Sequence, residues 1–281
     1  MNMHYPKKTI QVPTVNTYRE SDAGKLPVLD VRNLGIDFGG LTAVDSFNVT
    51  LGPTEICGLI GPNGAGKTTV FNMLTGVYQP TRGSVLINGI DTKGMPTHKV
   101  TKLGIARTFQ NIRLFTDMSV LDNVKVGMHN QIKCPFISSM LHLPDYYAAE
   151  KKSNQKAMEL LDFMGLAELA DQKAGSLPYG VQRRLEIVRA LATNPSIILL
   201  DEPAAGMNPS ETTELMHQIR RIRDTFHIAI FLIEHDMNLV MNVCETIAVL
   251  NYGRLIAKGT PEEIKQNPAV IEAYLGKEDA E

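Results

Sequence analysis

A glycine-rich run that ends in a lysine and two threonines occupies residues 61–69. Its spacing matches G-x-x-x-x-G-K-[ST], in which glycines let backbone N–H groups surround a phosphate at a helix N-terminus. The residues expected to bind nucleotide are Gly61, Pro62, Asn63, Gly64, Ala65, Gly66, Lys67, Thr68 and Thr69. Lys67 would reach the β- and γ-phosphates, and the Thr68 hydroxyl would ligate Mg²⁺. The pattern predicts a nucleoside triphosphate site; the alternative, a structural turn, fits the flanking sequence poorly.

Two acidic residues follow an apolar run at residues 197–200. Asp201 is expected to hold Mg²⁺ through water. Glu202 points in a different direction, and a carboxylate there is suited to orient or deprotonate the water that attacks the γ-phosphate. Taken alone this signal is weak, because strand-terminal acids are common. Together with the phosphate motif it predicts metal-assisted phosphoryl transfer to water.

The elements that must position these residues are visible as apolar runs. Residues 56–60 and 197–200 have the length and continuity of buried strands. A helix is expected over residues 68–74, so the glycine turn falls between a strand and a helix, as the motif requires. Ligands of open parallel sheets bind at the carboxyl ends of the strands, so Asp201 should emerge beside the loop that carries Lys67.

The composition is that of a soluble globular chain, with 281 residues, a net charge of −2 and 43% hydrophobic residues. The longest apolar runs, at 197–200 and 228–233, are far shorter than the ~20 residues that span a bilayer. Residues 1–25 are polar and lack the apolar core of a secretory signal, so we expect a flexible N-terminal extension and a cytoplasmic protein.

Nucleic-acid binding and cysteine chemistry are both disfavoured. The densest basic cluster lies on a helix expected to end near Asp224, and we interpret it as a solvated face. Its members are Arg220, Arg221 and Arg223. The cysteines are scattered, lack the spacing of metal ligands and are expected to be reduced, mostly buried thiols. They are Cys57, Cys134 and Cys244.

The order of the motifs resembles that of an ATP-binding-cassette (ABC) ATPase, the motor subunit of ABC transporters. After the phosphate motif come Thr108-Phe109-Gln110, Gly180-Val181-Gln182-Arg183-Arg184, Leu199-Leu200-Asp201-Glu202-Pro203 and Ile233-Glu234-His235-Asp236. Within that superfamily the chain resembles the importer subunit for branched-chain amino acids. The strings that carry this likeness are Phe38-Gly39-Gly40-Leu41, Ala106-Arg107-Thr108-Phe109-Gln110, Arg113-Leu114-Phe115, Gln182-Arg183-Arg184-Leu185-Glu186-Ile187 and Asp201-Glu202-Pro203-Ala204-Ala205-Gly206.

The resemblance implies roles for three further side chains. Phe38 would lie against the adenine, since an aromatic face suits a flat heterocycle. Gln110 would touch Mg²⁺ or the attacking water and move with a membrane partner. His235 would contact the γ-phosphate. The catalytic candidates are therefore Lys67, Gln110, Glu202 and His235. The alternatives are an ordinary core phenylalanine, a plain loop glutamine and a structural histidine.

One segment departs from the superfamily pattern. Most cassettes read Leu-Ser-Gly-Gly-Gln where this chain reads Leu177, Pro178, Tyr179, Gly180 and Val181, which we call the signature segment. In the family this segment reaches across a dimer interface to the ATP bound by the facing subunit. Pro178 has neither a hydroxyl nor a backbone N–H, so Gly180 and the following helix N-terminus must supply the contact. The segment Ala205-Gly206-Met207-Asn208 likewise has Asn208 where Asp is commoner in the family, which removes a charge but keeps a polar side chain.

The implied fold is an α/β P-loop NTPase (RecA-like) core of the ABC-ATPase type, with an antiparallel β subdomain and a helical subdomain. The ABC domain is expected over 26–265, with the helical subdomain at about 114–182 and a C-terminal helix and tail at 266–281. Within the helical part, an apolar insert at 135–143 could face a membrane partner or be an ordinary packed loop. A last helix is expected from Pro261.

The resemblance implies an ATP-hydrolysing, Mg²⁺-dependent subunit of a branched-chain amino acid importer, peripheral to the cytoplasmic face of the plasma (inner) membrane. Its partners would be integral membrane permease subunits, a second ABC ATPase as homo- or heterodimer and, indirectly, an extracytoplasmic solute-binding protein, with no nucleic acid. The alternatives are a soluble ABC-type ATPase without a permease, and a regulatory cassette that binds ATP and hydrolyses it weakly.

Overall fold

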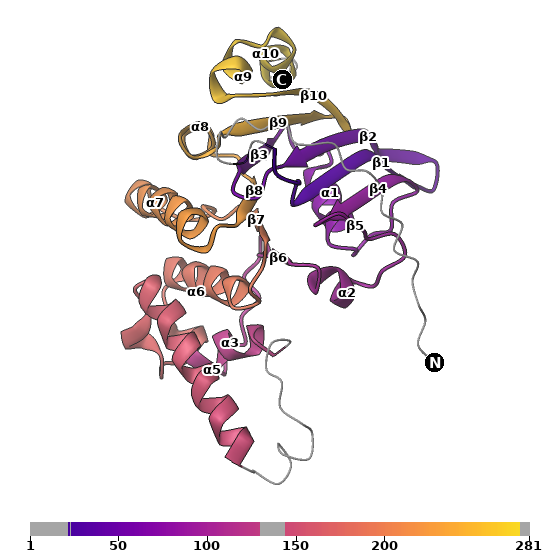
Figure 1. Ribbon diagram of the computed structural model, residues 1–281. Coiled ribbons are helices and arrows are strands. Elements are labelled where there is room, and N and C mark those ends of the chain that lie inside the picture. Colours follow the sequence, from indigo (N-terminus) through magenta and orange to yellow (C-terminus); the bar gives the residue numbers. More distant parts are fainter. Residues whose placement is uncertain (1–21, 23, 130–143, 276–281) are drawn as a thin grey trace, which may run out of the picture.

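The computed structural model describes residues 22, 24–129 and 144–275, and a central parallel sheet runs through them (Figure 1). In these residues the sheet has six strands in the order β10-β9-β3-β8-β7-β6, and only β10 runs antiparallel to its neighbour. The strands are β3 (Ile56–Ile60), β6 (Ile105–Arg107), β7 (Ile197–Asp201), β8 (Ala229–Ile233), β9 (Thr246–Asn251) and β10 (Arg254–Gly259). The expected strands at 56–60 and 197–200 are therefore present.

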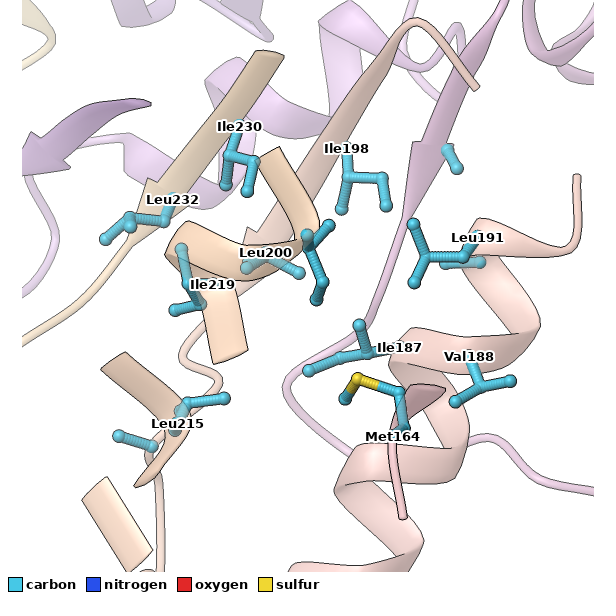
Figure 2. Close-up of a cluster of buried hydrophobic side chains, with 14 of the residues drawn as sticks. Met164, Ile187, Val188, Leu191, Ile198, Leu200, Leu215, Ile219, Ile230 and Leu232 are labelled. Carbon is cyan, nitrogen blue, oxygen red and sulfur yellow. The ribbon is translucent and has the colours of Figure 1, made fainter. Parts of the chain in front are cut away.

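The middle strands are apolar throughout because both faces of the sheet are covered. Every residue of β3, β7 and β8 is buried. Alternate side chains enter opposite layers. Ile198 and Leu200 of β7 pack with helices on one face, in the cluster drawn in Figure 2. Ile197 and Leu199 belong to a second buried cluster on the other face.

An antiparallel sheet and a helix cover that second face. Among the described residues this sheet has four strands, in the order β2-β1-β4-β5. They are β1 (Leu29–Phe38), β2 (Leu41–Leu51), β4 (Arg82–Ile87) and β5 (Ile90–Asp91). Phe47 of β2, Phe71 of the helix that follows β3 and Phe231 of β8 join one buried cluster. The predicted α/β core with an antiparallel β subdomain is confirmed.

Helices cover the other face and form the lower part of the molecule in Figure 1. The described helices are α1 (Lys67–Leu74), α2 (Thr97–Thr101), α3 (Val120–Gly127), α5 (Pro144–Phe163), η2 (Ala167–Leu169), η3 (Ala174–Ser176), α6 (Tyr179–Leu191), α7 (Pro209–Phe226), α8 (Met237–Val243), α9 (Pro261–Gln266) and α10 (Pro268–Leu275). Helix α6 crosses the expected boundary at 182 and packs on both α3 and β6. The apolar insert at 135–143 lies outside the described residues. No helix in the described ranges is both long and apolar enough to cross a membrane.

The chain after β10 forms two helices, one from Pro261, where a helix was expected, and one within 266–281, where a C-terminal helix and tail were expected. Helix α9 ends at Gln266 and α10 begins at Pro268. The break follows from Pro268, because proline lacks an N–H and pushes the residue before it out of the helical region. Asn267 accordingly has φ −76° and ψ 117°.

In the arginine cluster of α7, Arg220 and Arg221 are exposed, as a solvated face requires, whereas Arg223 is half-buried. Arg220 donates a hydrogen bond to the carbonyl of Asn242, and the Arg221 guanidinium lies 4.7 Å from the centre of the Phe163 ring. Arg223 pairs with Glu245, and only 12% of the Arg223 side chain is exposed. These arginines tie α7 to neighbouring elements.

The expected N-terminal extension falls almost entirely outside the described residues. Asp22, within it, is fully buried. Its carboxylate accepts hydrogen bonds from the backbone N–H of Thr54, at 2.8 Å, and from the Thr54 hydroxyl. Asp22 is thereby joined to the turn that precedes β3.

Candidate ATP-hydrolysis site

The phosphate loop, residues 61–69, joins β3 to α1 and depends on glycine at two positions. Gly61 has φ +150°, and a Cβ there would lie 2.0 Å from the carbonyl oxygen of Leu250. Gly66 has φ +102°, and its Cβ would lie 2.9 Å from the carbonyl oxygen of Ala43. Side chains at either position would meet backbone atoms, so glycine is required for packing as well as for the turn.

The mouth of the loop is open. Gly64 has φ +79°, and a Cβ added there would meet no atom within 4 Å. Asn63 and Thr68 are exposed, whereas Ala65 is buried. The loop thus presents backbone and the Thr68 hydroxyl to free space at the start of α1, where helix N–H groups lack intrahelical acceptors.

Lys67 is the first residue of α1 and is 7% exposed. Its Nζ donates to the carbonyl oxygens of Gly61, at 2.7 Å, and Pro62, at 3.0 Å. The ammonium group is therefore held over the loop itself. A flexible lysine stem allows such a group to turn toward an anion that enters the loop.

Two of the predicted catalytic side chains, Gln110 and His235, contact the carboxylate of a third, Glu202. Glu202 follows β7 with φ +47°, and its backbone N–H donates to the carbonyl of Ile233 at the end of β8. Gln110 Nε2 donates to Glu202 Oε2 at 2.7 Å. His235 Nε2 lies 2.9 Å from Glu202 Oε1. Residues from the ends of three neighbouring strands, β6, β7 and β8, thus converge.

The second acid, Asp201, already has a partner that sequence reasoning missed. Arg107 Nη2 lies 2.6 Å from Asp201 Oδ2, and the two side chains are 6% and 5% exposed. The same guanidinium donates through Nη1 to Asn72 Oδ1 at 2.7 Å and lies 5.1 Å from the centre of the Phe109 ring. One carboxylate oxygen of the predicted Mg²⁺ ligand is therefore fixed by a buried cation.

Glu234 lies within the motif Ile233-Glu234-His235-Asp236, from which no role was predicted for it. Its side chain is 4% exposed and accepts from the backbone N–H groups of Ala204, at 2.7 Å, and His235, at 2.9 Å. Burial raises the pKa of Glu234, and the backbone donors oppose that shift. Glu234 joins the segment after β7 to the segment after β8, and so helps place His235 beside Glu202.

The signature segment forms the start of α6. Pro178 is the N-cap and makes no side-chain capping bond; its carbonyl accepts from the N–H groups of Val181 and Gln182. Leu177 is buried and Tyr179 is 45% exposed. A Cβ on Gly180 would lie 3.1 Å from Glu211 Oε1 of α7.

Asn208 lies close to the signature segment and has a clear local role. It is the N-cap of α7, and its side chain accepts from the backbone N–H of Glu211 at 3.0 Å. The Glu211 carboxylate accepts from the Asn208 N–H in return, which completes a capping box. An amide oxygen is sufficient for this bond, so asparagine serves here as well as aspartate.

Phe38 is not an ordinary core residue. It ends β1, is 44% exposed and packs edge-to-face against Tyr78, with 5.4 Å between the ring centres. An exposed ring that is held in place by a neighbour is suited to stacking against a flat ligand.

These residues fit ATP and Mg²⁺. The open cradle at Gly64 leaves room for phosphate, Lys67 supplies a cation and Phe38 an exposed ring. No group of three or more His, Cys, Asp or Glu that could hold a metal ion by itself is found in residues 22, 24–129 and 144–275. Mg²⁺ bound to a nucleotide does not need such a group, because phosphate and water supply most of its ligands.

A cavity of about 420 Å³ opens beside the Gln110 loop, which we define as residues 108–113. Its lining includes Phe109 and Arg113 of that loop, Val126 of α3, and Glu186 and Arg189 of α6. Burial raises the pKa of Glu186 and lowers that of Arg189. The cavity therefore borders the segment that delivers Gln110 to Glu202.

Comparisons with known proteins show which family the chain resembles. The family model described as "ABC transporter" matches residues 44–205, and that of the "Branched-chain amino acid ATP-binding cassette transporter" matches residues 254–280. The "High-affinity branched-chain amino acid transport ATP-binding protein LivG" of Escherichia coli (strain K12) is 48% identical over 89% of this chain and 98% of the relative. BraF of Pseudomonas aeruginosa, of the same description, is 45% identical over the same shares.

A solved structure gives the same result. The ADP conformation of MJ1267, an ATP-binding cassette of an ABC transporter, has a TM-score of 0.78 and 30% identity over 90% of this chain and all of that one. ATP hydrolysis is the activity of the family. The chain belongs to the ABC transporter ATP-binding family, together with these branched-chain amino acid relatives, and is an ATPase.

Proposed function

We propose that the chain is the ATP-hydrolysing motor subunit of a membrane importer for branched-chain amino acids. The observation that supports ATP hydrolysis is the convergence of Gln110 and His235 on Glu202, at 2.7 and 2.9 Å, at the sheet edge that also carries the phosphate loop. A carboxylate held by two polar side chains from separate loops can be aligned for proton transfer.

The roles of the side chains follow from their chemistry. Lys67 and the loop N–H groups bind the β- and γ-phosphates, and the Phe38 ring lies against the adenine. Thr68, Asp201 and Gln110 would hold Mg²⁺, directly or through water. When bound, this ion neutralises phosphate charge as the bond to the γ-phosphate breaks.

Glu202 is the general base of the proposal. Its carboxylate accepts the proton of the attacking water, while Gln110 and His235 keep the carboxylate in one orientation. The exposed His235 ring, at 47%, is free to contact the γ-phosphate as well. Catalysis then comes from positioning and from charge stabilisation, with no covalent intermediate on the protein.

The signature segment acts on a second ABC ATPase. Its exposed Tyr179 and the helix N-terminus at Gly180 present backbone donors at the surface, and these would face ATP bound by the other subunit. The missing hydroxyl at Pro178 predicts slower hydrolysis at that facing site. Either two copies of the chain or a pair with a related cassette would satisfy this arrangement.

The membrane partners are permease subunits, and the cavity beside the Gln110 loop is where we place their contact. A permease segment seated there would touch Phe109 and Arg113, and so would act on Gln110. The chain would thus be peripheral to the cytoplasmic face of the membrane. A solute-binding protein on the other side of the membrane would act indirectly, through the permease.

The substrate class is supported by the relatives alone, since the cassette does not touch the transported molecule. LivG and BraF are named for high-affinity branched-chain amino acid transport, and the C-terminal family match covers residues 254–280. Nucleic acid is not a proposed partner, because a net charge of −2 provides no basic surface field.

The experiment is to purify the chain with the proteins that accompany it and to reconstitute them in liposomes. ATP-dependent uptake of labelled leucine, lost on Lys67→Ala in this chain alone, is the expected result. Full ATPase activity without any co-purifying membrane protein would favour the ATPase without a permease. Undiminished ATPase activity of the assembly after Lys67→Ala would favour the regulatory cassette.

A further inference from the structure

The Gln110 loop is held by a charged side chain that the proposed reaction does not use. Arg183, on the second turn of α6, is 2% exposed. Its Nη1 donates to the carbonyl of Phe109 at 2.6 Å, and its Nη2 donates to the carbonyl of Gln110. A single guanidinium therefore fixes two successive peptide groups, one of which belongs to the residue that bonds Glu202.

Glu186 completes this arrangement one turn further along α6. Its Oε2 lies 3.2 Å from Arg183 Nη1, and its Oε1 accepts from the backbone N–H of Arg113 at 3.3 Å. Glu186 is also 2% exposed. The pair thus binds both ends of the Gln110 loop, through carbonyls at 109 and 110 and an N–H at 113.

Arg183 also faces the signature segment. Its guanidinium carbon lies 5.5 Å from the centre of the Tyr179 ring, within the range of a cation–π contact. Arg183 Nε is buried without a hydrogen-bond partner. Burying an ion pair with an unsatisfied donor is a poor way to stabilise a helix contact, because apolar side chains would serve as well or better. This energetic cost indicates that Arg183 serves to position the Gln110 loop rather than to stabilise the fold.

We propose that Arg183 is a positioning residue for ATP hydrolysis, which sets Gln110 against Glu202 and ties the Gln110 loop to the signature segment. This inference rests on the proposed function. Movement of α6 would carry the carbonyl of Gln110 with it and lengthen the bond from the Gln110 amide to Glu202. The orientation of the Glu202 carboxylate would then depend on the position of the signature segment, which in the proposed function faces the second subunit.

The test measures ATP hydrolysis by the reconstituted assembly with Arg183→Lys in this chain. Lysine keeps the charge but cannot hold two carbonyls in one plane. We expect kcat to fall about tenfold while KM for ATP changes by less than about twofold, since the phosphate loop is untouched. The matched control is Arg184→Lys, because Arg184 pairs with the exposed Glu214 at 3.2 Å and should leave both constants unchanged.

A double-mutant cycle distinguishes positioning from a structural role. Once Gln110→Ala has removed the amide, Arg183→Lys should cause little further loss of kcat, because the two residues act through the same bond. Three results would each overturn the inference. They are fold losses of kcat that multiply in the double mutant, a rise in KM of Arg183→Lys with unchanged kcat, and an equal effect of the control Arg184→Lys. If Arg183→Lys does not fold, Glu186→Gln takes its place, with a smaller fall in kcat that is again absent in the Gln110→Ala background.

Failure of this inference is separable from failure of the proposed function. Glu202→Gln and Lys67→Ala are measured in the same assembly. Suppose that these two variants abolish hydrolysis, while the fold losses of kcat caused by Arg183→Lys and Gln110→Ala multiply in the double mutant. Only the proposed role of Arg183 is then wrong. If they leave hydrolysis unchanged, the site itself is wrong, and no result with Arg183 can restore it.

Discussion

Arg107 and Asp201 form an ion pair in the interior, with 2.6 Å between Nη2 and Oδ2 and side-chain exposures of 6% and 5%. The pair joins the end of β6 to the end of β7, directly before Glu202. Two charges removed from water depend on each other, because the attraction of the partner offsets much of the desolvation of each. The position of Asp201 is therefore linked to that of Arg107.

Arg107→Met should destabilise the protein by about 3–5 kcal/mol, because it leaves the Asp201 carboxylate buried without a counter-charge. Urea unfolding measures this change. The control is Arg82→Met, which breaks solvent-accessible pairs with Asp37 and Asp45 and should cost no more than about 1 kcal/mol. Equal losses in the two variants would show that Asp201 does not need its partner.

Two glycines of the phosphate loop should respond differently to alanine. Gly61→Ala places a Cβ against the carbonyl oxygen of Leu250 and should lower the free energy of unfolding by at least ~2 kcal/mol. Gly64→Ala meets no atom and should cost only about 1 kcal/mol for its positive φ, yet its methyl group enters the open cradle. We expect Gly64→Ala to lose binding of a fluorescent ATP analogue; wild-type affinity would place the phosphates elsewhere.

Phe38→Ala should weaken ATP binding without slowing the chemical step. Stacking of a base on an aromatic ring contributes about 1–3 kcal/mol, so KM for ATP should rise about tenfold or more at nearly constant kcat. Leu41→Ala, at an exposed position close by on β2, is the matched control. If both variants behave like the wild type, the adenine does not lie on the Phe38 ring.

The buried cysteines should be unreactive in the folded protein at all ordinary pH values. Burial raises the pKa of the Cys57 thiol to about 12 and that of Cys244 well above its usual value. Raising the pH from 7 to 9 therefore leaves the thiolate fraction of Cys57 at about one in a thousand or less. In a Cys134→Ser background, the remaining thiols should be labelled only after the protein is denatured. Complete labelling of the native protein within minutes would contradict the burial of these thiols.

The elements around the motifs could be predicted from the sequence because their signals are local. The buried strands are short continuous apolar runs, and the phosphate loop carries its glycines at a fixed spacing. Helix α1 begins one residue earlier than expected, at Lys67. The break before Pro268 also follows from a local signal, since proline interrupts a helix at a known place.

The charged residues that support the site could not be found in this way. Arg107, Arg183 and Glu234 all lie within the motif strings, but charged side chains are usually exposed, so the sequence does not predict their burial. Their burial depends on partners far along the chain, such as Asp201 for Arg107. Periodicity carries no information about such pairs, which only the packed fold brings together.

The measurement that tests the account most directly is ATP turnover of Glu202→Gln in the purified assembly, together with its affinity for ATP. The amide keeps the size of the side chain but cannot accept a proton from water. We predict wild-type affinity for ATP and a fall in turnover of at least ~10². Unchanged turnover would contradict the account, because the carboxylate on which Gln110 and His235 converge would then not be the base.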